Sequence, residues 1–163
     1  MTEVEFLDTA DDSLLKFAVI ISRYQGKWLF CKHRERDTYE CPGGHREPGE
    51  AIEDTARRDL YEETGAVSFT LTPVSAYSVH EAFDGLEAPA ISCGMLYYGC
   101  ITELGPIPEG YEIERTELFR DPPGNWTYPD IQPVLLGYLE TWLCRPGQDG
   151  TNGGEWISDC HFR

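Results

Sequence analysis

The sequence predicts an α/β or α+β fold, in which two helices pack on a mixed β-sheet. Runs rich in β-branched and aromatic residues are interleaved with segments of helical periodicity, and this alternation is typical of helices packed on a sheet. With 163 residues, of which 40% are hydrophobic, the chain can bury the core of one domain. We expect that domain over residues 1–145 and a flexible Gly-rich tail over residues 146–163.

The strands are predicted from apolar, β-rich runs bounded by turn residues. In chain order they lie at residues 16–22, 27–33, 69–79, 91–102 and 113–119. Tyr24-Gln25-Gly26 separates the first two runs, and a glycine there suits a tight turn, so these two strands should form a hairpin.

Two segments have helical periodicity. In residues 51–64, apolar side chains recur every fourth position from Ile52 to Leu60, and Gly65 supplies a stop. Residues 131–144 form an amphipathic run that predicts a closing helix.

The charge balance excludes several classes of partner. With 13 Lys+Arg against 29 Asp+Glu, the net charge is −16 and the pI is about 4.5, so no DNA binding is expected. No run approaches the length of a membrane span, and the acidic N-terminus does not resemble a signal peptide, so no membrane contact is expected. We therefore predict a cytoplasmic protein.

The six cysteines show no C-x-x-C spacing. Cys31, Cys93 and Cys100 lie in apolar, strand-like runs, so we interpret the cysteines as buried thiols in preference to disulfides or a zinc site.

Three carboxylates share one side of the first predicted helix. Asp59, Glu62 and Glu63 are spaced i, i+3, i+4, so they can reach a common point. Like charges this close need compensation, and Mg²⁺ prefers carboxylate oxygens together with phosphates. The alternative is a solvated acidic face, but acids at a helix C-terminus oppose the macrodipole.

A Gly-rich loop, CPGGHREPGE at residues 41–50, precedes this helix. Loop and helix together resemble the Nudix box, G-x5-E-x7-R-E-U-x-E-E-x-G-U, where U is a bulky aliphatic residue. The matching positions are Gly44, Glu50, Arg58, Leu60, Glu62, Glu63 and Gly65.

Two positions depart from the box. Asp59 replaces its first R-E-U-x-E-E glutamate, and Ala66 replaces the final aliphatic residue. Aspartate keeps the charge but reaches about 1.5 Å less far. The metal must then shift toward the helix, or water must bridge the gap; otherwise one metal site is weak.

The wider chain, over about residues 14–143, looks like the MutT-type branch of the Nudix family. This resemblance implies an α/β/α sandwich with a mixed sheet between helices. In that branch an Asn after a Pro-Pro-x turn reads oxidised guanine, and Pro122-Pro123-Gly124-Asn125 matches that pattern, although it is also an ordinary turn sequence.

The resemblance also implies a set of ligands. Glu62 and Glu63 would bind Mg²⁺ or Mn²⁺, Asp59 would be a ligand or activate water, and the Gly44 carbonyl would be a further ligand. Arg58 would orient the helix through the preceding loop, or else form a plain surface pair with Glu62.

Family members usually add a later carboxylate. Glu109, Glu112, Glu114 and Glu117 lie in the right region, and we choose Glu112, with a solvated strand edge as the alternative. Lys32 and Arg34 share one face of the second strand, where they could contact phosphates or only solubilise the surface.

The function implied is metal-dependent hydrolysis of a nucleoside diphosphate linked to another moiety. A nucleoside triphosphate pyrophosphohydrolase, with oxidised (d)GTP as a candidate substrate, ranks first, acting as a monomer or homodimer on a nucleotide. Other Nudix substrates are ADP-ribose, dinucleoside polyphosphates or an RNA 5′ end; Glu81 stands where the ADP-ribose branch has Pro. A third interpretation is a nucleotide sensor in which Asp59 marks a weakened site.

Overall fold

The computed structural model describes residues 1–145. Its elements are, in chain order, β1 (Thr2–Leu7), η1 (Asp12–Leu14), β2 (Leu15–Tyr24), β3 (Lys27–His33), β4 (Tyr39–Glu40), β5 (Gly43–His45), α1 (Ile52–Thr64), β6 (Ala66–Glu81), β7 (Ala90–Leu104), β8 (Ile113–Phe119) and α2 (Gln132–Leu143). All five predicted strands and both predicted helices are present. β1 and the short strands β4 and β5 were not predicted from the sequence. The predicted tail, residues 146–163, lies outside the described residues.

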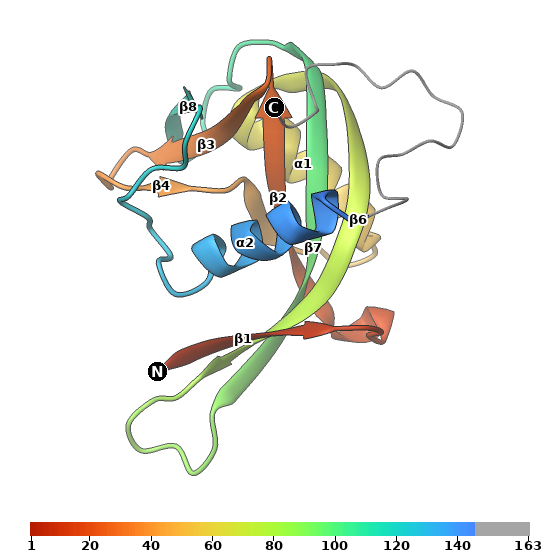
Figure 1. Cartoon of the computed structure of the whole chain (residues 1–163), viewed down its shortest axis with the longest axis vertical. Coiled ribbons are helices and arrows are strands. Elements are labelled where there is room, and N and C mark those ends of the chain that lie inside the picture. Colours follow the sequence, from red (N-terminus) through yellow and green to blue (C-terminus); the bar gives the residue numbers. More distant parts are fainter. Residues whose placement is uncertain (146–163) are drawn as a thin grey trace.

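The eight strands form one mixed sheet in the order β1-β6-β7-β2-β3-β4, with β5 paired to β2 and β8 paired to β3 (Figure 1). β2 and β7 are parallel, and the other pairs are antiparallel. The predicted hairpin joins β2 and β3, and both Gln25 and Gly26 have positive φ angles there, of 53° and 74°.

β2 changes partner along its length. Its residues 17–19 pair with β5, whereas residues 22–24 pair with β3. The Gly-rich segment that precedes α1 is therefore built into the sheet as β5, beside residues 17–19 of β2.

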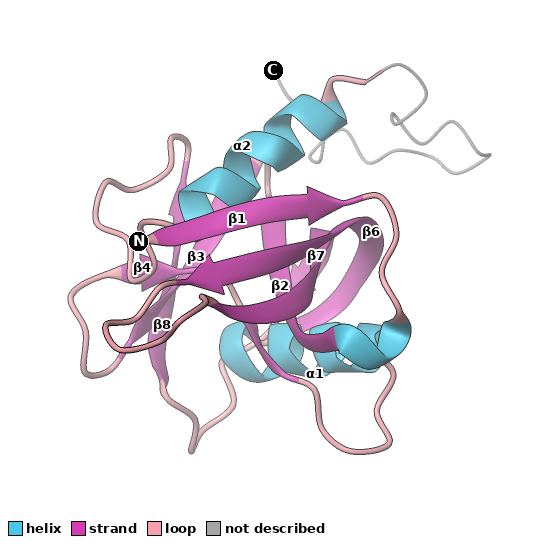
Figure 2. Cartoon of the chain, turned by 90° about the horizontal axis from the view of Figure 1, so that it is seen from below, coloured by secondary structure: helices cyan, strands magenta, loops and turns pink. Residues whose placement is uncertain are grey.

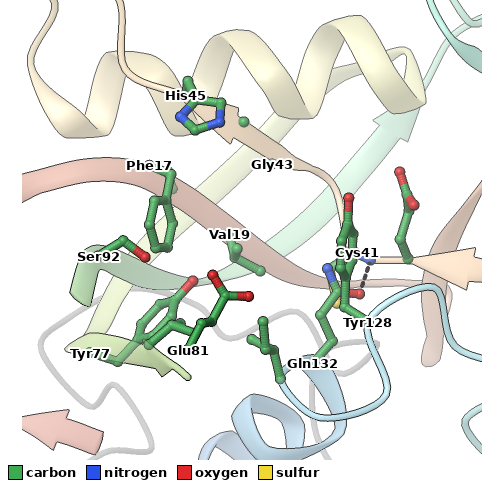
Figure 3. Close-up of a pocket in the computed structure, with 15 residues that line it drawn as sticks. Phe17, Val19, Cys41, Gly43, His45, Tyr77, Glu81, Ser92, Tyr128 and Gln132 are labelled. Atoms are coloured by element: carbon green, nitrogen blue, oxygen red, sulfur yellow. Dashed lines mark hydrogen bonds between the residues drawn. The ribbon is translucent and has the colours of Figure 1, made fainter. Parts of the chain in front are cut away.

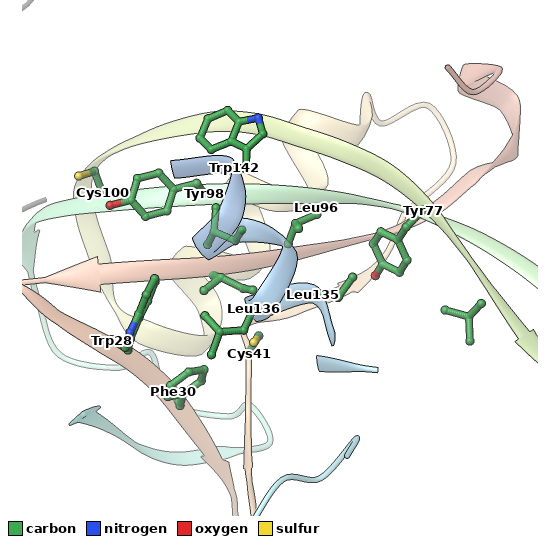
Figure 4. Close-up of a cluster of buried hydrophobic side chains, with 13 residues drawn as sticks. Trp28, Phe30, Cys41, Tyr77, Leu96, Tyr98, Cys100, Leu135, Leu136 and Trp142 are labelled. Atoms are coloured by element: carbon green, nitrogen blue, oxygen red, sulfur yellow. The ribbon is translucent and has the colours of Figure 1, made fainter. Parts of the chain in front are cut away.

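The helices cover opposite faces of the sheet (Figure 2). Ala56 and Leu60 of α1 are fully buried against one face, and Leu135 and Leu139 of α2 are fully buried against the other. Figure 4 shows the second cluster, in which α2 packs on aromatic side chains of the sheet. This arrangement confirms the predicted α/β/α sandwich. Within residues 1–145, no helix is long and apolar enough to cross a membrane.

The cysteines are only partly as expected. Cys31 and Cys41 are buried free thiols, and Cys93 and Cys144 are also free. Cys100, in β7, is disulfide-bonded, so the expectation of thiols was wrong at this position. The spacing of cysteines along the chain does not determine which of them form disulfides, so the sequence did not reveal this bond.

Candidate active site

The C-terminal end of α1 is fixed by Gly65. This residue has a φ of 77°, and its N–H donates to the carbonyl oxygen of Tyr61 at 2.8 Å. A side chain at this position would place Cβ 2.5 Å from the carbonyl oxygens of Gly105 and Pro106. Only glycine fits, and the last turn of α1, which carries Glu62 and Glu63, is held in place.

β5 runs directly alongside the carboxylates of α1. The N–H of Gly43 donates to Oε2 of Glu63 at 2.7 Å. A Cβ at Gly44 would lie 2.7 Å from Oδ2 of Asp59, closer than real Cβ contacts. Two consecutive glycines therefore let the backbone approach the acidic side of the helix, as a ligand-contacting loop must do.

Asp59 is buried, with 5% of its surface exposed. Its Oδ1 accepts a hydrogen bond from Nη1 of Arg58 at 2.9 Å. Its Oδ2 is buried and has no hydrogen-bond partner in the described part of the chain. Burial raises the pKa of Asp59 from 3.8 to about 6, although the charge of Arg58 lowers it.

Glu63 and Glu62 differ in environment. Burial raises the pKa of Glu63 from 4.5 to about 8, against the lowering effect of the Gly43 N–H. Glu62 is more open, with a side chain 24% exposed; its Oε1 accepts from the hydroxyl of Tyr111 at 3.2 Å.

Arg58 ties α1 to the loop before it. Its guanidinium donates to both carboxylate oxygens of Glu50, at 2.8 and 3.0 Å, and to the carbonyl oxygen of His45 at 3.1 Å. The hydrogen bonds from Arg58 and from the Thr55 hydroxyl lower the pKa of Glu50 to about 2. The hydrogen bonds to Glu50 raise the pKa of Arg58. The guanidinium also lies 3.5 Å from Oε2 of Glu62, so both contacts foreseen for Arg58 are present.

The donor set suits a hard divalent cation. The unpartnered Oδ2 of Asp59 and the carboxylates of Glu62 and Glu63 are oxygen donors, the kind that Mg²⁺ and Mn²⁺ take. As the side chains stand, no group of three or more His, Cys, Asp or Glu in residues 1–145 converges closely enough to hold a metal. Arg58 lies among the acids and neutralises part of their charge.

The later glutamates lie apart from this cluster. Glu112 has a side chain 84% exposed, and its Oε2 is 3.4 Å from Nε2 of His33. Glu114 pairs with Lys32 at 2.8 Å, and Glu117 accepts a hydrogen bond from the Tyr39 hydroxyl. One hydrogen bond joins this region to α1, from the hydroxyl of Tyr111 to Oε1 of Glu62.

The predicted substrate-binding residues contact other parts of the protein. Besides its pair with Glu114, Lys32 donates to the carbonyl oxygen of His33 at 3.3 Å. Nε of Arg34 donates to the carbonyl oxygen of Tyr111 at 3.3 Å. Nδ2 of Asn125 donates to that of Asp37 at 2.8 Å, which is the behaviour of a turn residue.

A pocket of about 330 Å³ lies on the other side of β5 from the acidic helix, and Gly43 and Gly44 line it (Figure 3). Its other walls include Phe17, Val19, Cys41, Tyr77, Glu81 and Gln132. Phe17 and Gln132 were not predicted from the sequence as site residues, and Glu81 was singled out only because it replaces a proline of the ADP-ribose branch. These residues belong to β2, α2 and β6, and no local motif joins them.

Fold and site together define an α/β/α protein in which a paired-glycine strand separates an acidic helix from a pocket. Residues 13–120 match the sequence profile of the NUDIX domain. The chain belongs to the Nudix family and is a Nudix pyrophosphohydrolase. Enzymes of this family generally use divalent metals such as Mg²⁺.

Two similar curated proteins and one similar crystal structure come from Bacillus subtilis. The chain is 32% identical, over 76% of its length and 73% of the relative, to a protein named "Putative 8-oxo-dGTP diphosphatase YtkD". It is 30% identical, over 62% of its length and 52% of the relative, to an ADP-ribose pyrophosphatase. The crystal structure of a mutant of the pyrophosphohydrolase BsRppH superposes with a TM-score of 0.69 and 29% identity, covering 86% of this chain and 90% of that one.

Proposed function

We propose that this enzyme hydrolyses nucleoside triphosphates to nucleoside monophosphates and pyrophosphate, with oxidised (d)GTP among its substrates. The observation that carries the proposal is the position of the Gly43–Gly44 strand, which contacts Glu63 and Asp59 on one side and lines a pocket on the other. A nucleotide bound across this strand would have its base in the pocket and its phosphates beside the carboxylates. The similarity to the YtkD protein supports the same substrate class.

Asp59, Glu62, Glu63 and the Gly44 carbonyl would hold Mg²⁺ or Mn²⁺. When bound, the metal supplies charge neutralisation and Lewis acidity at the phosphates. The −16 charge of the chain makes such neutralisation necessary for holding a polyphosphate.

Arg58 is a positioning residue in this proposal. Its two-point contact with Glu50 fixes the loop against the helix, and its contact with Asp59 fixes that carboxylate. Glu112 is kept as the later carboxylate because its side chain is 84% exposed and is held only by its pair with His33 among the described residues. Lys32, Arg34 and Asn125 are kept as substrate-binding residues.

The test is a substrate panel scored for pyrophosphate at saturating Mg²⁺ or Mn²⁺, with all four deoxynucleoside triphosphates and 8-oxo-dGTP. We expect release from at least one nucleotide, none with chelator, and a loss of about 10²-fold or more in Glu63→Gln. Glu103→Gln, the same change at an exposed position of β7, should keep full activity. Absence of pyrophosphate release from every nucleotide contradicts the proposal.

A second candidate is a Nudix substrate of another class, favoured by the relative named ADP-ribose pyrophosphatase. ADP-ribose, a dinucleoside tetraphosphate and a 5′-triphosphate RNA therefore belong in the same panel, scored for their own products. Turnover of one of these at a higher kcat/KM than any triphosphate would favour it.

The variant Asp59→Glu distinguishes an active enzyme from a nucleotide sensor. Increased turnover in this variant supports an enzyme in which Asp59 is a weaker metal ligand than glutamate. Tight nucleotide binding with no turnover in either protein, measured by calorimetry, supports a sensor.

A further inference from the structure

The pocket beside β5 contains a buried amide whose nitrogen has no hydrogen-bond partner among residues 1–145. Gln132 is 5% exposed, and its Oε1 accepts a hydrogen bond from the backbone N–H of Cys41 at 2.8 Å. Because that N–H is a donor, the amide orientation is determined: the oxygen faces Cys41 and the NH₂ group faces the pocket. Nε2 makes no hydrogen bond with any residue of the described chain, so the pocket offers a preoriented donor.

Glu81 supplies an acceptor in the same pocket. It is the last residue of β6, its side chain is half-buried, and its carboxylate forms no ion pair or hydrogen bond within residues 1–145. Figure 3 shows Glu81 and Gln132 on the same side of β2, facing a common space. A carboxylate accepts two parallel N–H bonds, and an amide NH₂ beside it donates.

This pattern complements one nucleobase edge. Guanine presents the O6 acceptor next to two donors, N1–H and N2–H, whereas adenine presents a donor amine next to the N1 lone pair. Resting on the proposed function, we infer that the pocket selects guanine nucleotides, with Glu81 accepting from N1–H and N2–H and Gln132 donating to O6. Oxidation at C8 leaves this edge unchanged, so guanine and 8-oxoguanine are both accommodated.

Phe17 forms an apolar wall for the base. The ring of Phe17 can lie where it does because its partner in β7, Gly94, has no side chain. A Cβ at Gly94 would lie 2.1 Å from Cε2 of Phe17. The pocket volume of about 330 Å³ lies in the range of small-molecule sites and has room for a purine. The wall fixes the plane of the base, and the two polar groups then read its edge.

Adenine is rejected because both polar groups lose their partners. The half-buried carboxylate meets a lone pair, and the buried amide NH₂ meets another NH₂, so neither group gains a hydrogen bond from adenine. Hypoxanthine keeps O6 and N1–H but lacks the N2 amine, and it should lose one bond only. We therefore expect binding to weaken about 10-fold from GMP to IMP and about 100-fold or more from GMP to AMP.

The test is calorimetry of GMP, IMP and AMP with the full chain, and kcat/KM for dGTP and dATP. Glu81→Gln should weaken GMP binding at least about 10-fold and raise the KM for dGTP, with little change in AMP binding. Gln132→Glu keeps an oxygen for the Cys41 N–H but opposes O6, so it should lose GMP selectivity too. Glu87→Gln, an exposed glutamate in the loop after β6, is the matched control and should behave as wild type.

Equal binding of GMP and AMP, or unchanged GMP binding in Glu81→Gln with normal thermal unfolding, overturns the inference. Monophosphate binding is measured without turnover, so its result is separable from the proposed function. Pyrophosphate release from dGTP and dATP at equal kcat/KM would leave the proposed hydrolysis standing and remove the guanine selectivity. GMP selectivity without hydrolysis of any triphosphate would do the reverse.

Discussion

The unpartnered Oδ2 of Asp59 costs the metal-free protein stability, because its burial favours the protonated acid over the charged form. The pKa is raised from 3.8 to about 6, so this cost is present above pH 6 and absent below pH 3.8. Asp59→Asn should therefore raise the free energy of unfolding at about pH 7.5, without metal, by about 1–2 kcal/mol.

In the same variant hydrolysis should fall about 10²-fold, because a ligand oxygen is lost. Urea unfolding at about pH 7.5 and about pH 4 tests the stability change, and the difference between the two proteins should shrink at the lower pH. A destabilised Asp59→Asn protein at neutral pH would show that the Arg58 contact outweighs burial.

The charged carboxylate of Glu50 stabilises the folded protein, whereas that of Asp59 destabilises it. Its pKa falls from 4.5 to about 2 because of Arg58 and Thr55, so its contribution is complete above pH 4.5 and is lost as the pH falls through about 2. We expect Glu50→Gln to lower the free energy of unfolding at about pH 7 by about 2 kcal/mol.

That difference should become smaller as the pH approaches about 2. The control is Glu53→Gln, which removes an exposed pair with Arg57 and should change stability by less than about 0.5 kcal/mol. A pH-independent difference for Glu50→Gln would mean that the loss comes from packing and not from the ion pair.

At the scale of the element, the end of α1 depends on one backbone conformation. Gly65→Ala should lower the free energy of unfolding by about 2 kcal/mol or more, since it combines a left-handed residue with a clash against Gly105 and Pro106. It should also reduce hydrolysis by displacing Glu62 and Glu63.

The matched control for this prediction is Gly137→Ala in α2. Gly137 has open space around its Cβ position and ordinary helical φ, so alanine should stabilise the protein by about 0.5–1 kcal/mol. Thermal unfolding of both variants checks the pair, and a neutral Gly65→Ala would show that the helix end can move.

The acidic helix could be predicted from the sequence because its signals are local. The spacing from Ile52 to Leu60, the stop at Gly65 and the Nudix pattern all lie within one segment. β4 and β5 were missed because strands of two and three residues carry too little periodicity, and a Gly-rich strand has no side-chain alternation. The pocket could not be predicted because Glu81 and Gln132 meet only through the topology of the sheet.

At the scale of the whole molecule, the two helices depend on the same sheet. Leu60 and Leu139 are both fully buried, but they lie in separate clusters on opposite faces. We expect Leu60→Ala and Leu139→Ala each to lower the free energy of unfolding by about 2–5 kcal/mol, and the double variant to be close to additive. Val134→Ala, at an exposed position of α2, should change it little.

Urea unfolding, followed by far-UV and near-UV circular dichroism, measures the free energies of unfolding of these variants. Coincident transitions in each single variant are expected, since both faces share one sheet. A second transition in either variant would mean that one layer unfolds alone.

The strip of two glycines between α1 and the pocket has an evolutionary consequence. Under the proposed function, substitutions in β6 or α2 would change which nucleotide the pocket accepts and would leave the carboxylates of α1 in place. Substitutions that change nucleotide preference should accordingly occur around Glu81 and Gln132, whereas Gly43 and Gly44 should stay unchanged.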